Sequence, residues 1–427
     1  MSRIDEKILA SMTERRRDFH KYPETGWTEF RTTAKIADIL EALGYVVHFG
    51  DEFIKPEDVM GRKIDASAEK TRAIAQGANA DTVNRIESYT GLYADLDTGA
   101  PGPFTALRFD IDCVDTTEAT DDAHLPAREG FESVNPGRMH SCAHDGHAAV
   151  GLALAELLKA ANEEKKLKGK IRLIFQPAEE GVRGGYAMTK AGIADGADYF
   201  VAMHLGLGRP TGEVYGGTDG FLCTTKLDAD FEGVGAHAGG EPQKGKNALL
   251  AAATAALNLH AIAPHSEGTT RINVGVLKAG EGRNVVPPNA HMKVETRGET
   301  NDLAAYVYDR AVQILEGAAQ MHGVKLEVSK QGEANTTNST PALAQIVTEA
   351  AKEVVGVTLA EATRKMAGSD DACWFMKRVQ DGGGQATYVG VGATTAAGHH
   401  NNRFDFDEAA MPVALEVLYG AVRKTNG

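Results

Sequence analysis

The sequence predicts an α/β protein whose mostly parallel sheet has helices on both faces and into which a smaller α+β domain is inserted. From Phe104 onward, short apolar runs alternate with helical stretches, as in proteins built from parallel strands and crossover helices. Between Thr224 and Gly332 the expected order becomes β-α-β-β-α-β, the order of a ferredoxin-like sandwich. A length of 427 residues also favours two domains. We expect a first domain of residues 1–221 and 335–427 and an inserted domain of residues 222–334.

Two amphipathic helices open the first domain, at Ile4–Phe19 and at Thr32–Leu43, and Gly44 is expected to cap the second. Residues 55–90 are polar, rich in alanine and helix-prone, so we expect them to form a surface insertion. The other elements follow from short apolar runs and from stretches with helical spacing. Strands are expected at Thr105–Phe109, Ile171–Phe175, Tyr199–Met203 and Ala386–Val391, and helices at Ala148–Ala161 and Tyr186–Lys190.

The inserted domain is expected to contain two helices and the strands that they cover. The expected strands are Thr224–Val234, Arg271–Leu277, His291–Arg297 and Lys325–Lys330. The expected helices are Ala248–Ala261 and Asn301–Met321. A split unit of this kind forms a small domain in its own right.

Composition and charge exclude several classes of function. The chain is charged from its third residue and has no apolar run long enough for a secretory signal or a membrane span. Four cysteines are too few for a disulfide framework, which favours the cytoplasm. A net charge of −14 argues against nucleic acid, because phosphate contacts need clustered Lys and Arg. If the substrate is an anion, metal ions or a placed arginine must supply positive charge locally.

The segment Met139–His147 is the sharpest local signal for metal binding. If it is extended, His140, Cys142 and His144 point to one side, and a thiolate with imidazoles is a suitable ligand set. Asp145 would then orient a ligand through a hydrogen bond. The alternative interpretation is a histidine-rich loop that precedes a helix.

A pair of carboxylates, Glu179 and Glu180, follows a predicted buried strand, at the place where open α/β sheets hold their ligands. Because neighbouring side chains point in different directions, one can bind metal while the other handles protons. His204 ends the next predicted strand, and Gly398–Phe404 contains two more histidines. Each feature alone is typical of structural residues, but one thiolate, three imidazoles and one or two carboxylates together fit a pair of divalent ions.

With these segments the chain resembles the amidohydrolase branch of the aminoacylase and carboxypeptidase G superfamily of metallopeptidases. The resemblance spans about residues 13–420 and includes the insertion after residue 55. It implies hydrolysis of the amide bond of p-aminobenzoyl-glutamate or a similar N-acyl amino acid, with two Mn²⁺ or Zn²⁺ ions per subunit. The segments that carry the resemblance are Arg108–Asp112, Met139–His147, Phe175–Gly181, Ala261–Gly268, Gly282–Pro287, Val294–Gly298 and Gly398–Glu408.

The resemblance also implies roles for individual residues. Glu179 would match the catalytic base, and His237 a small-domain histidine that steadies the reacting carbonyl, often from a partner subunit. Asn284 and Arg297 would match residues that hold the substrate carboxylate. Most relatives have Gly where this chain has Ala143, so alanine would add strain if this position needs positive φ. The implied metal ligands are Cys142, His144, Glu180, His204 and His400.

In the implied mechanism, two divalent ions lower the pKa of a shared water. Glu179 would take its proton and return it to the leaving amine, while His237 helps to stabilise the oxyanion. Arg297 would form a forked pair with the substrate carboxylate, a geometry that lysine does not reproduce. Asp110 and Asp112 are expected to support the site without binding metal.

The resemblance further implies that the inserted domain is a lid or dimerisation domain. Residues near 220 and 335 would be its hinges, and closure would exclude water from the metals. The chain would form a homodimer, or a heterodimer with a related chain.

Three other functions stay open. A hydrolase of other N-acyl or indole-acyl amino acids would use the same site, because the residues of the acyl pocket are not assigned. A non-catalytic relative would lack a ligand or Glu179, and neither is missing. A structural zinc site usually contains several cysteines. The glycines at 181, 184 and 185 are not followed by the Lys-Ser/Thr that a phosphate loop requires.

Overall fold

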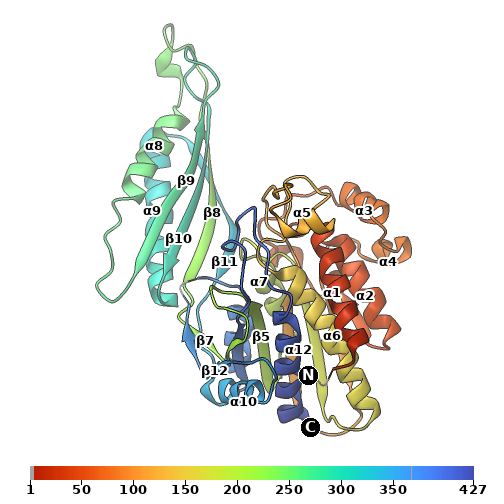
Figure 1. The fold of residues 1–427 in the computed structure, drawn as a ribbon. Coiled ribbons are helices and arrows are strands. Elements are labelled where there is room, and N and C mark those ends of the chain that lie inside the picture. Colours follow the sequence, from red (N-terminus) through yellow and green to blue (C-terminus); the bar gives the residue numbers. More distant parts are fainter. Residues whose placement is uncertain (1–3, 367) are drawn as a thin grey trace. The chain divides into compact units, whose positions relative to one another are not determined.

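A computed structural model describes residues 4–366 and 368–427 of the chain. By its internal contacts the chain divides into two compact units. Unit 1 contains the residues up to Asp219 together with Thr337–Met366 and Asp370–Gly427, and unit 2 is built around Gly220–Thr336. These limits lie two residues from the expected boundaries at 221/222 and 334/335. Both units are drawn in Figure 1.

Unit 1 is built on an eight-stranded sheet with the order β1-β2-β4-β3-β5-β14-β6-β12. The strands β4, β3, β5 and β14 are parallel to one another, whereas β2 and β6 run antiparallel to their neighbours β4 and β14. The expected mostly parallel sheet is thereby confirmed. The strand bounds are β1 Val46–Phe49, β2 Leu92–Asp97, β3 Phe104–Asp110, β4 Lys170–Gln176, β5 Tyr199–Leu205, β6 Glu213–Tyr215, β12 Leu359–Glu361 and β14 Gln385–Val391, and β7 Thr218–Asp219 pairs with β13 Arg364–Lys365 in a separate two-stranded sheet.

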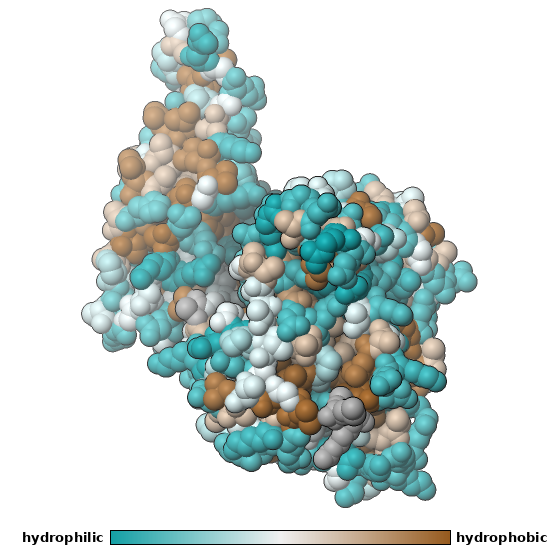
Figure 2. Space-filling view, viewed as in Figure 1, coloured by the Kyte–Doolittle hydropathy of each residue, from teal (hydrophilic) through white to brown (hydrophobic). Residues whose placement is uncertain are grey.

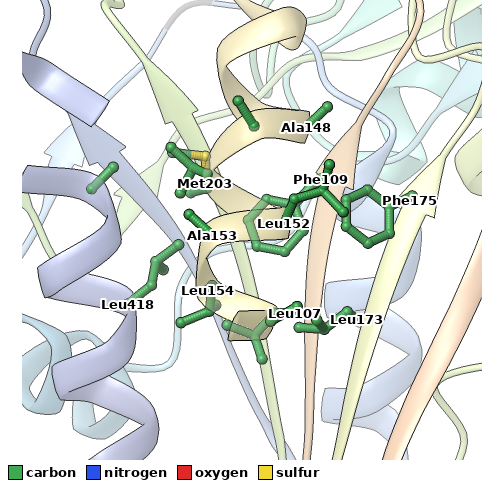
Figure 3. Packing of buried hydrophobic residues seen from close by; sticks show 14 of the residues in the cluster. Leu107, Phe109, Ala148, Leu152, Ala153, Leu154, Leu173, Phe175, Met203 and Leu418 are labelled. Atoms are coloured by element: carbon green, nitrogen blue, oxygen red, sulfur yellow. The ribbon is translucent and has the colours of Figure 1, made fainter. Parts of the chain in front are cut away.

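Helices cover both faces of this sheet. The helix α6 (His144–Glu163) is buried along most of its length, and Figure 3 shows its leucines against side chains of β3, β4 and β5. On the opposite face, Phe375 of α11 (Ala372–Asp381) stacks on Phe200 of β5, with 5.4 Å between the ring centres. The other helices of unit 1 are α1 Glu6–Lys21, α2 Phe30–Ala42, α3 Ala66–Ala75, α4 Ala80–Arg85, α5 Leu125–Glu129, α7 Gly184–Lys190, α10 Pro341–Ala351 and α12 Ala410–Asn426, with 3₁₀ turns at Gly50–Glu52 and Pro56–Asp58.

The insertion at residues 55–90 forms α3 and α4, and it is tied to the rest of unit 1 by polar contacts. The indole N–H of the buried Trp27 donates to the Met60 carbonyl at 2.9 Å. Arg72 of α3 pairs with the buried Glu24 at 3.1 Å. Arg183, three residues after Glu180, donates to the Gly61 carbonyl at 3.2 Å. The insertion therefore braces a loop that carries predicted site residues, although it contributes none of its own.

Unit 2 has the chain order β-α-β-β-α-β, and its four strands form an antiparallel sheet with the order β11-β8-β10-β9. Leu227, Ala229 and Phe231 alternate along β8 and belong to an apolar core that includes residues of both helices. Figure 2 shows apolar side chains gathered over α8, where Leu250 and Leu257 are 48% and 76% exposed. The bounds are β8 Cys223–Glu232, α8 Ala248–Leu259, β9 Thr270–Ala279, β10 Asn289–Gly298, α9 Asn301–His322 and β11 Lys325–Ala334, with a 3₁₀ turn at Pro242–Lys244.

Within residues 4–366 and 368–427, no helix is both long enough and apolar enough to cross a membrane.

Candidate metal centre

The site lies where the parallel strands of unit 1 end. Glu179 and Glu180 follow β4, His204 is near the end of β5, and the loop after β14 carries His400. Because β4, β3, β5 and β14 are parallel neighbours, their carboxyl ends meet at one edge of the sheet. This is the edge at which open α/β sheets hold their ligands.

The turn before α6 determines how Cys142 and His144 are presented. Ala143 has φ 69°, in the left-handed region, and His144 is already the first residue of the helix. The expectation of an extended segment is therefore wrong, because the left-handed Ala143 interrupts the extended backbone and a helix begins at His144. His140 is buried and both its ring nitrogens lack a hydrogen-bond partner within the described chain, and it belongs to no group of candidate ligands. The alanine adopts the conformation that glycine accepts without strain.

All five predicted ligands converge. The Sγ atom of Cys142 lies 3.6 Å from Nε2 of His204, and Nε2 of His400 lies 3.2 Å from Oε1 of Glu180. Ligand atoms of Cys142, Glu180 and His400 lie within 4.8 Å of one another. The same holds for His144, Glu179 and Glu180, so Glu180 is common to two groups of donors.

The donor histidines are oriented as metal ligands require. The Nδ1–H of His144 donates to the Asp112 carbonyl at 2.9 Å, and its buried Nε2 has no hydrogen-bond partner among the residues described. The Nδ1–H of His204 donates to the Leu205 carbonyl at 2.7 Å. Both rings thus hold their proton on Nδ1 and leave the Nε2 lone pair for a ligand, the usual arrangement of a metal-bound histidine. This donor set fits divalent metal ions.

Asp112 fixes the positions of the two glutamates. Its Oδ1 accepts the backbone N–H of Glu179 at 3.1 Å, and its Oδ2 accepts that of Glu180 at 2.9 Å. The carboxylate oxygens are thereby engaged with backbone, and Asp112 is in no group of candidate ligands found among the described residues. One side chain therefore sets the geometry of both acids.

Asp110 lies near two histidines that could bind metal, but it makes its hydrogen bonds to Arg108 and His147, which do not serve as ligands. Its carboxylate pairs with Arg108 at 2.6 Å and accepts the Nδ1–H of His147. Nε2 of His147 accepts the backbone N–H of Leu205 at 3.0 Å, so neither ring nitrogen has a lone pair left for a metal. Asp110, His144 and His147 are close enough to hold an ion, but the hydrogen bonds of His147 exclude it as a ligand.

Glu179 lies in an environment that disfavours its charged form. The side chain is buried, and burial together with the negative charge of Asp370 raises its pKa well above the usual range. Ligand oxygens of Glu179, Asp370 and Asp371 lie within 4.8 Å of one another. Asp370 accepts the hydroxyl of Tyr388 at 2.6 Å. The two aspartates were not predicted, although their adjacency before α11 repeats the pattern of the Glu179-Glu180 pair.

Asp145 does not contact the ligand histidines. Its Oδ2 forms an ion pair with Nε of Arg16 at 2.9 Å and accepts a hydrogen bond from Nδ1 of His20 at 2.8 Å, and its Oδ1 accepts the Gly146 N–H at 2.9 Å. Burial alone would lower the pKa of His20, but its hydrogen bonds to Asp145 and Glu118 raise this pKa to about 9. The expectation that Asp145 orients a ligand directly is wrong, since this network instead anchors the first turn of α6.

Close packing explains why glycine occupies positions 184 and 185, near Glu180. A side chain on Gly184 would meet the Pro177 carbonyl oxygen at 1.8 Å, and one on Gly185 would meet the Asp371 carbonyl oxygen at 2.5 Å. The Gly185 N–H donates to the Asp371 carboxylate at 2.7 Å. The Asp371 carboxylate therefore accepts the backbone N–H that a phosphate loop would offer to a phosphate.

The remaining predicted residues lie in unit 2. His237 pairs with Val285 in an isolated bridge, and the Ala238 N–H donates to the Asn284 carbonyl at 3.0 Å, which brings His237 and Asn284 close along the backbone. Nδ1 of His237 accepts the N–H groups of Gly239 and Gly240 at 3.1 and 2.9 Å. A neutral His237 therefore carries its proton on Nε2.

Arg297 is engaged by its own strand. Its Nε and one terminal nitrogen donate to Glu295 at 2.9 and 3.1 Å, and Lys226 approaches the same carboxylate at 2.8 Å. Despite partial burial, these cations lower the pKa of Glu295 to about 2. Arg297 thus forms a salt bridge within its own strand, and its role toward substrate stays a prediction.

Comparison with known proteins gives a consistent result. The profile described as Peptidase family M20/M25/M40 matches residues 106–424. The chain is 50% identical to indole-3-acetyl-aspartic acid hydrolase of Enterobacter agglomerans, covering 96% of this chain and 95% of the relative. It is 49% identical to one of the subunits of p-aminobenzoyl-glutamate hydrolase from Escherichia coli, with the same coverage. The crystal structure of aminobenzoyl-glutamate utilization protein from Klebsiella pneumoniae is 42% identical, has a TM-score of 0.84 and covers 98% of this chain and 96% of its own.

Proposed function

This chain belongs to peptidase family M20/M25/M40 and is an amidohydrolase, and we propose that it cleaves the amide between an aromatic acyl group and an acidic amino acid. The observation that carries the proposal is the meeting of Cys142, Glu180 and His400 beside the buried carboxyl group of Glu179. The names of the two relatives also support it. In both substrates an aromatic acyl group is joined to an amino acid with a side-chain carboxylate, glutamate in one and aspartate in the other.

The proposed cofactor is a pair of divalent ions, Mn²⁺ or Zn²⁺, held by the five predicted ligands. One thiolate, three imidazoles and a carboxylate form a mixed donor set that suits borderline metals. Bound ions would supply Lewis acidity toward the amide carbonyl and toward water. The metal-bound histidines would keep their orientation through the Asp112 and Leu205 carbonyls.

In the proposed reaction, Glu179 accepts a proton from the attacking water and donates it to the nitrogen of the leaving amino acid. Its raised pKa suits this exchange, because a carboxyl group whose pKa approaches the working pH can serve as base and then as acid. Asp112 holds the backbone of Glu179 at 3.1 Å, so the base keeps its position while it changes charge.

The residues of unit 2 are proposed to act on the substrate. The Nε2–H of His237 would donate to the carbonyl oxygen as negative charge develops there. Support comes from the two glycine N–H groups that occupy its Nδ1. Arg297, oriented by Glu295, and Asn284 would bind the carboxylate of the amino-acid half.

The test is a hydrolysis assay on the purified chain loaded with Mn²⁺ or Zn²⁺. We expect release of p-aminobenzoate from p-aminobenzoyl-glutamate and, as the second candidate, of indole-3-acetate from indole-3-acetyl-aspartate. N-acetyl-glutamate serves as a control that keeps the amino-acid half and removes the aromatic acyl group. A fully loaded chain that cleaves neither aromatic substrate would contradict the proposal, and equal cleavage of all three would remove the acyl preference.

We also propose that the chain acts as a homodimer in the cytoplasm. The exposed leucines on α8 support an assembly, and the free thiols at Cys113, Cys142 and Cys223 are compatible with a reducing compartment. Light scattering on the purified chain tests the assembly. A monomer would instead favour a heterodimer with a related chain, because the Escherichia coli relative is named as a subunit of its enzyme.

A further inference from the structure

His399 precedes the predicted ligand His400 and was not assigned a role by the sequence. Its Nδ1 lies 3.5 Å from Sγ of Cys142, and its Nε2 lies 3.1 Å from the backbone nitrogen of Leu207. The ring is held between Phe404, at 4.9 Å between ring centres, and His204, at 5.3 Å. By distance alone, Cys142, His204 and His399 also form a group that could hold an ion.

The contact with Leu207 decides the protonation of the ring. A backbone N–H can only donate, so Nε2 of His399 must accept and cannot carry a proton. The proton of the imidazole is therefore on Nδ1, the nitrogen that faces the sulfur. A metal on Nδ1 would require a ring with no proton on either nitrogen, which a neutral histidine does not provide.

The geometry points to His399 as a positioning residue that donates its Nδ1–H to the sulfur of Cys142 and does not bind metal. The inference rests on the proposed function in one respect, since it takes Cys142 to be a metal ligand. It also chooses between adjacent histidines, because His400, with Nε2 facing Glu180, remains as the ligand from this loop. A hydrogen bond to a thiolate fixes its direction and withdraws negative charge from it, as partners of metal ligands do.

Gly206 leaves room for the imidazole ring of His399. Gly206 has φ 86°, and a Cβ at this position would lie 2.9 Å from Nε2 of His399. A side chain at 206 would therefore push the ring away from the Leu207 N–H. Gly206→Ala therefore offers a way to displace the ring that donates to the Cys142 sulfur without altering either histidine.

The test uses the full chain loaded with Co²⁺, whose bond to a thiolate gives a charge-transfer absorption band. Cys142→Ser should abolish the band and so identify its origin. In His399→Phe we expect the wild-type number of bound ions and a band moved to longer wavelength, because sulfur without the hydrogen bond donates its electrons more easily. Co²⁺ affinity should fall about 10–100-fold. His399→Asn, whose amide N–H can replace Nδ1–H, should return the band toward its wild-type position.

The outcomes separate this inference from the proposed function. A wild-type chain without a thiolate band would remove Cys142 as a ligand and with it both proposals. A normal band that is unchanged in His399→Phe and in Gly206→Ala would overturn the hydrogen bond alone. Loss of an ion in His399→Phe, with full metal content in His400→Ala, would make His399 the ligand and reverse the assignment. Near-ultraviolet circular dichroism of each apo variant checks that it is folded.

Discussion

The predicted site residues of the two units differ in how the chain holds them. In unit 1, His144 and His204 are buried, and each donates its Nδ1–H to a backbone carbonyl. In unit 2, His237 is exposed, and its Nδ1 accepts backbone N–H groups. The same side chain is thus set to offer a lone pair in one unit and a proton in the other. The hydrogen-bond partner of Nδ1, more than the sequence around the residue, separates the predicted ligand histidines from the predicted donor histidine.

The largest expected effect is on Glu179. In Glu179→Gln, turnover should fall by about 10³-fold or more, because the proton acceptor is lost. Metal content should persist, since the ligands remain. The exposed Glu163→Gln is the matched control and should behave as the wild type. Turnover within a few-fold of the wild type would remove Glu179 as the base.

The comparison of the two histidine types is tested by His144→Ala against His237→Ala. The first should lose bound metal, measured by atomic emission on dialysed protein. The second should keep its metal but lose about 10²–10³-fold in turnover, as expected for an oxyanion donor. Metal loss in both variants, or in neither, would break the distinction between the units.

A smaller effect is expected at Arg297. A forked charged pair with the substrate carboxylate contributes about 1.5–3 kcal/mol, so Arg297→Ala should raise KM about 10–100-fold, with metal content unchanged. Arg297→Lys should recover only part of the loss, because lysine does not form the fork. An unaltered KM would leave only the pair with Glu295, which contributes about 0–1 kcal/mol at such a half-buried site.

The smallest effect on catalysis, but a measurable effect on stability, is expected from His20. The folded-state pKa of about 9 lies above the ordinary 6.5, so its contribution is complete below pH 6.5 and is lost as the pH rises through 9. The contribution is on the order of 3 kcal/mol at most. Urea midpoints of the apo chain should fall between pH 6.5 and 9.5. In His20→Gln they should be lower and flatter over this range, and parallel profiles for the two proteins would refute the assignment.

The sequence predicts the central strands of the fold better than its helix ends and its short strands. The strands β3, β4, β5 and β14 coincide with the expected apolar runs to within two residues, because strands buried on both faces form nearly continuous apolar runs. The helix α6 begins four residues earlier than expected, since the polar residues His144, Asp145 and His147 replace apolar residues in its first turn. The short strands β6 and β12, of three residues each, carry no periodic signal.

Within the site, residue types were predictable and geometry was not. A thiolate, histidines and paired carboxylates at strand ends identified a metal centre, but the left-handed turn at Ala143 leaves no signal in local alternation. The protonation of His399 depends on a backbone N–H 192 residues earlier in the chain, which no local pattern encodes. Asp145 likewise takes its partners Arg16 and His20 from a distant helix.

The hydrogen bonds of Asp112 to two successive backbone N–H groups have a consequence for engineering. Proton transfer and metal binding are proposed for different side chains, Glu179 and Glu180, but the backbone of both residues is positioned by Asp112. If Glu179 and Glu180 were transferred to another scaffold without Asp112, the two carboxylates would be present but not correctly positioned. The smallest transferable module is therefore the three-acid set, drawn from the ends of two neighbouring strands.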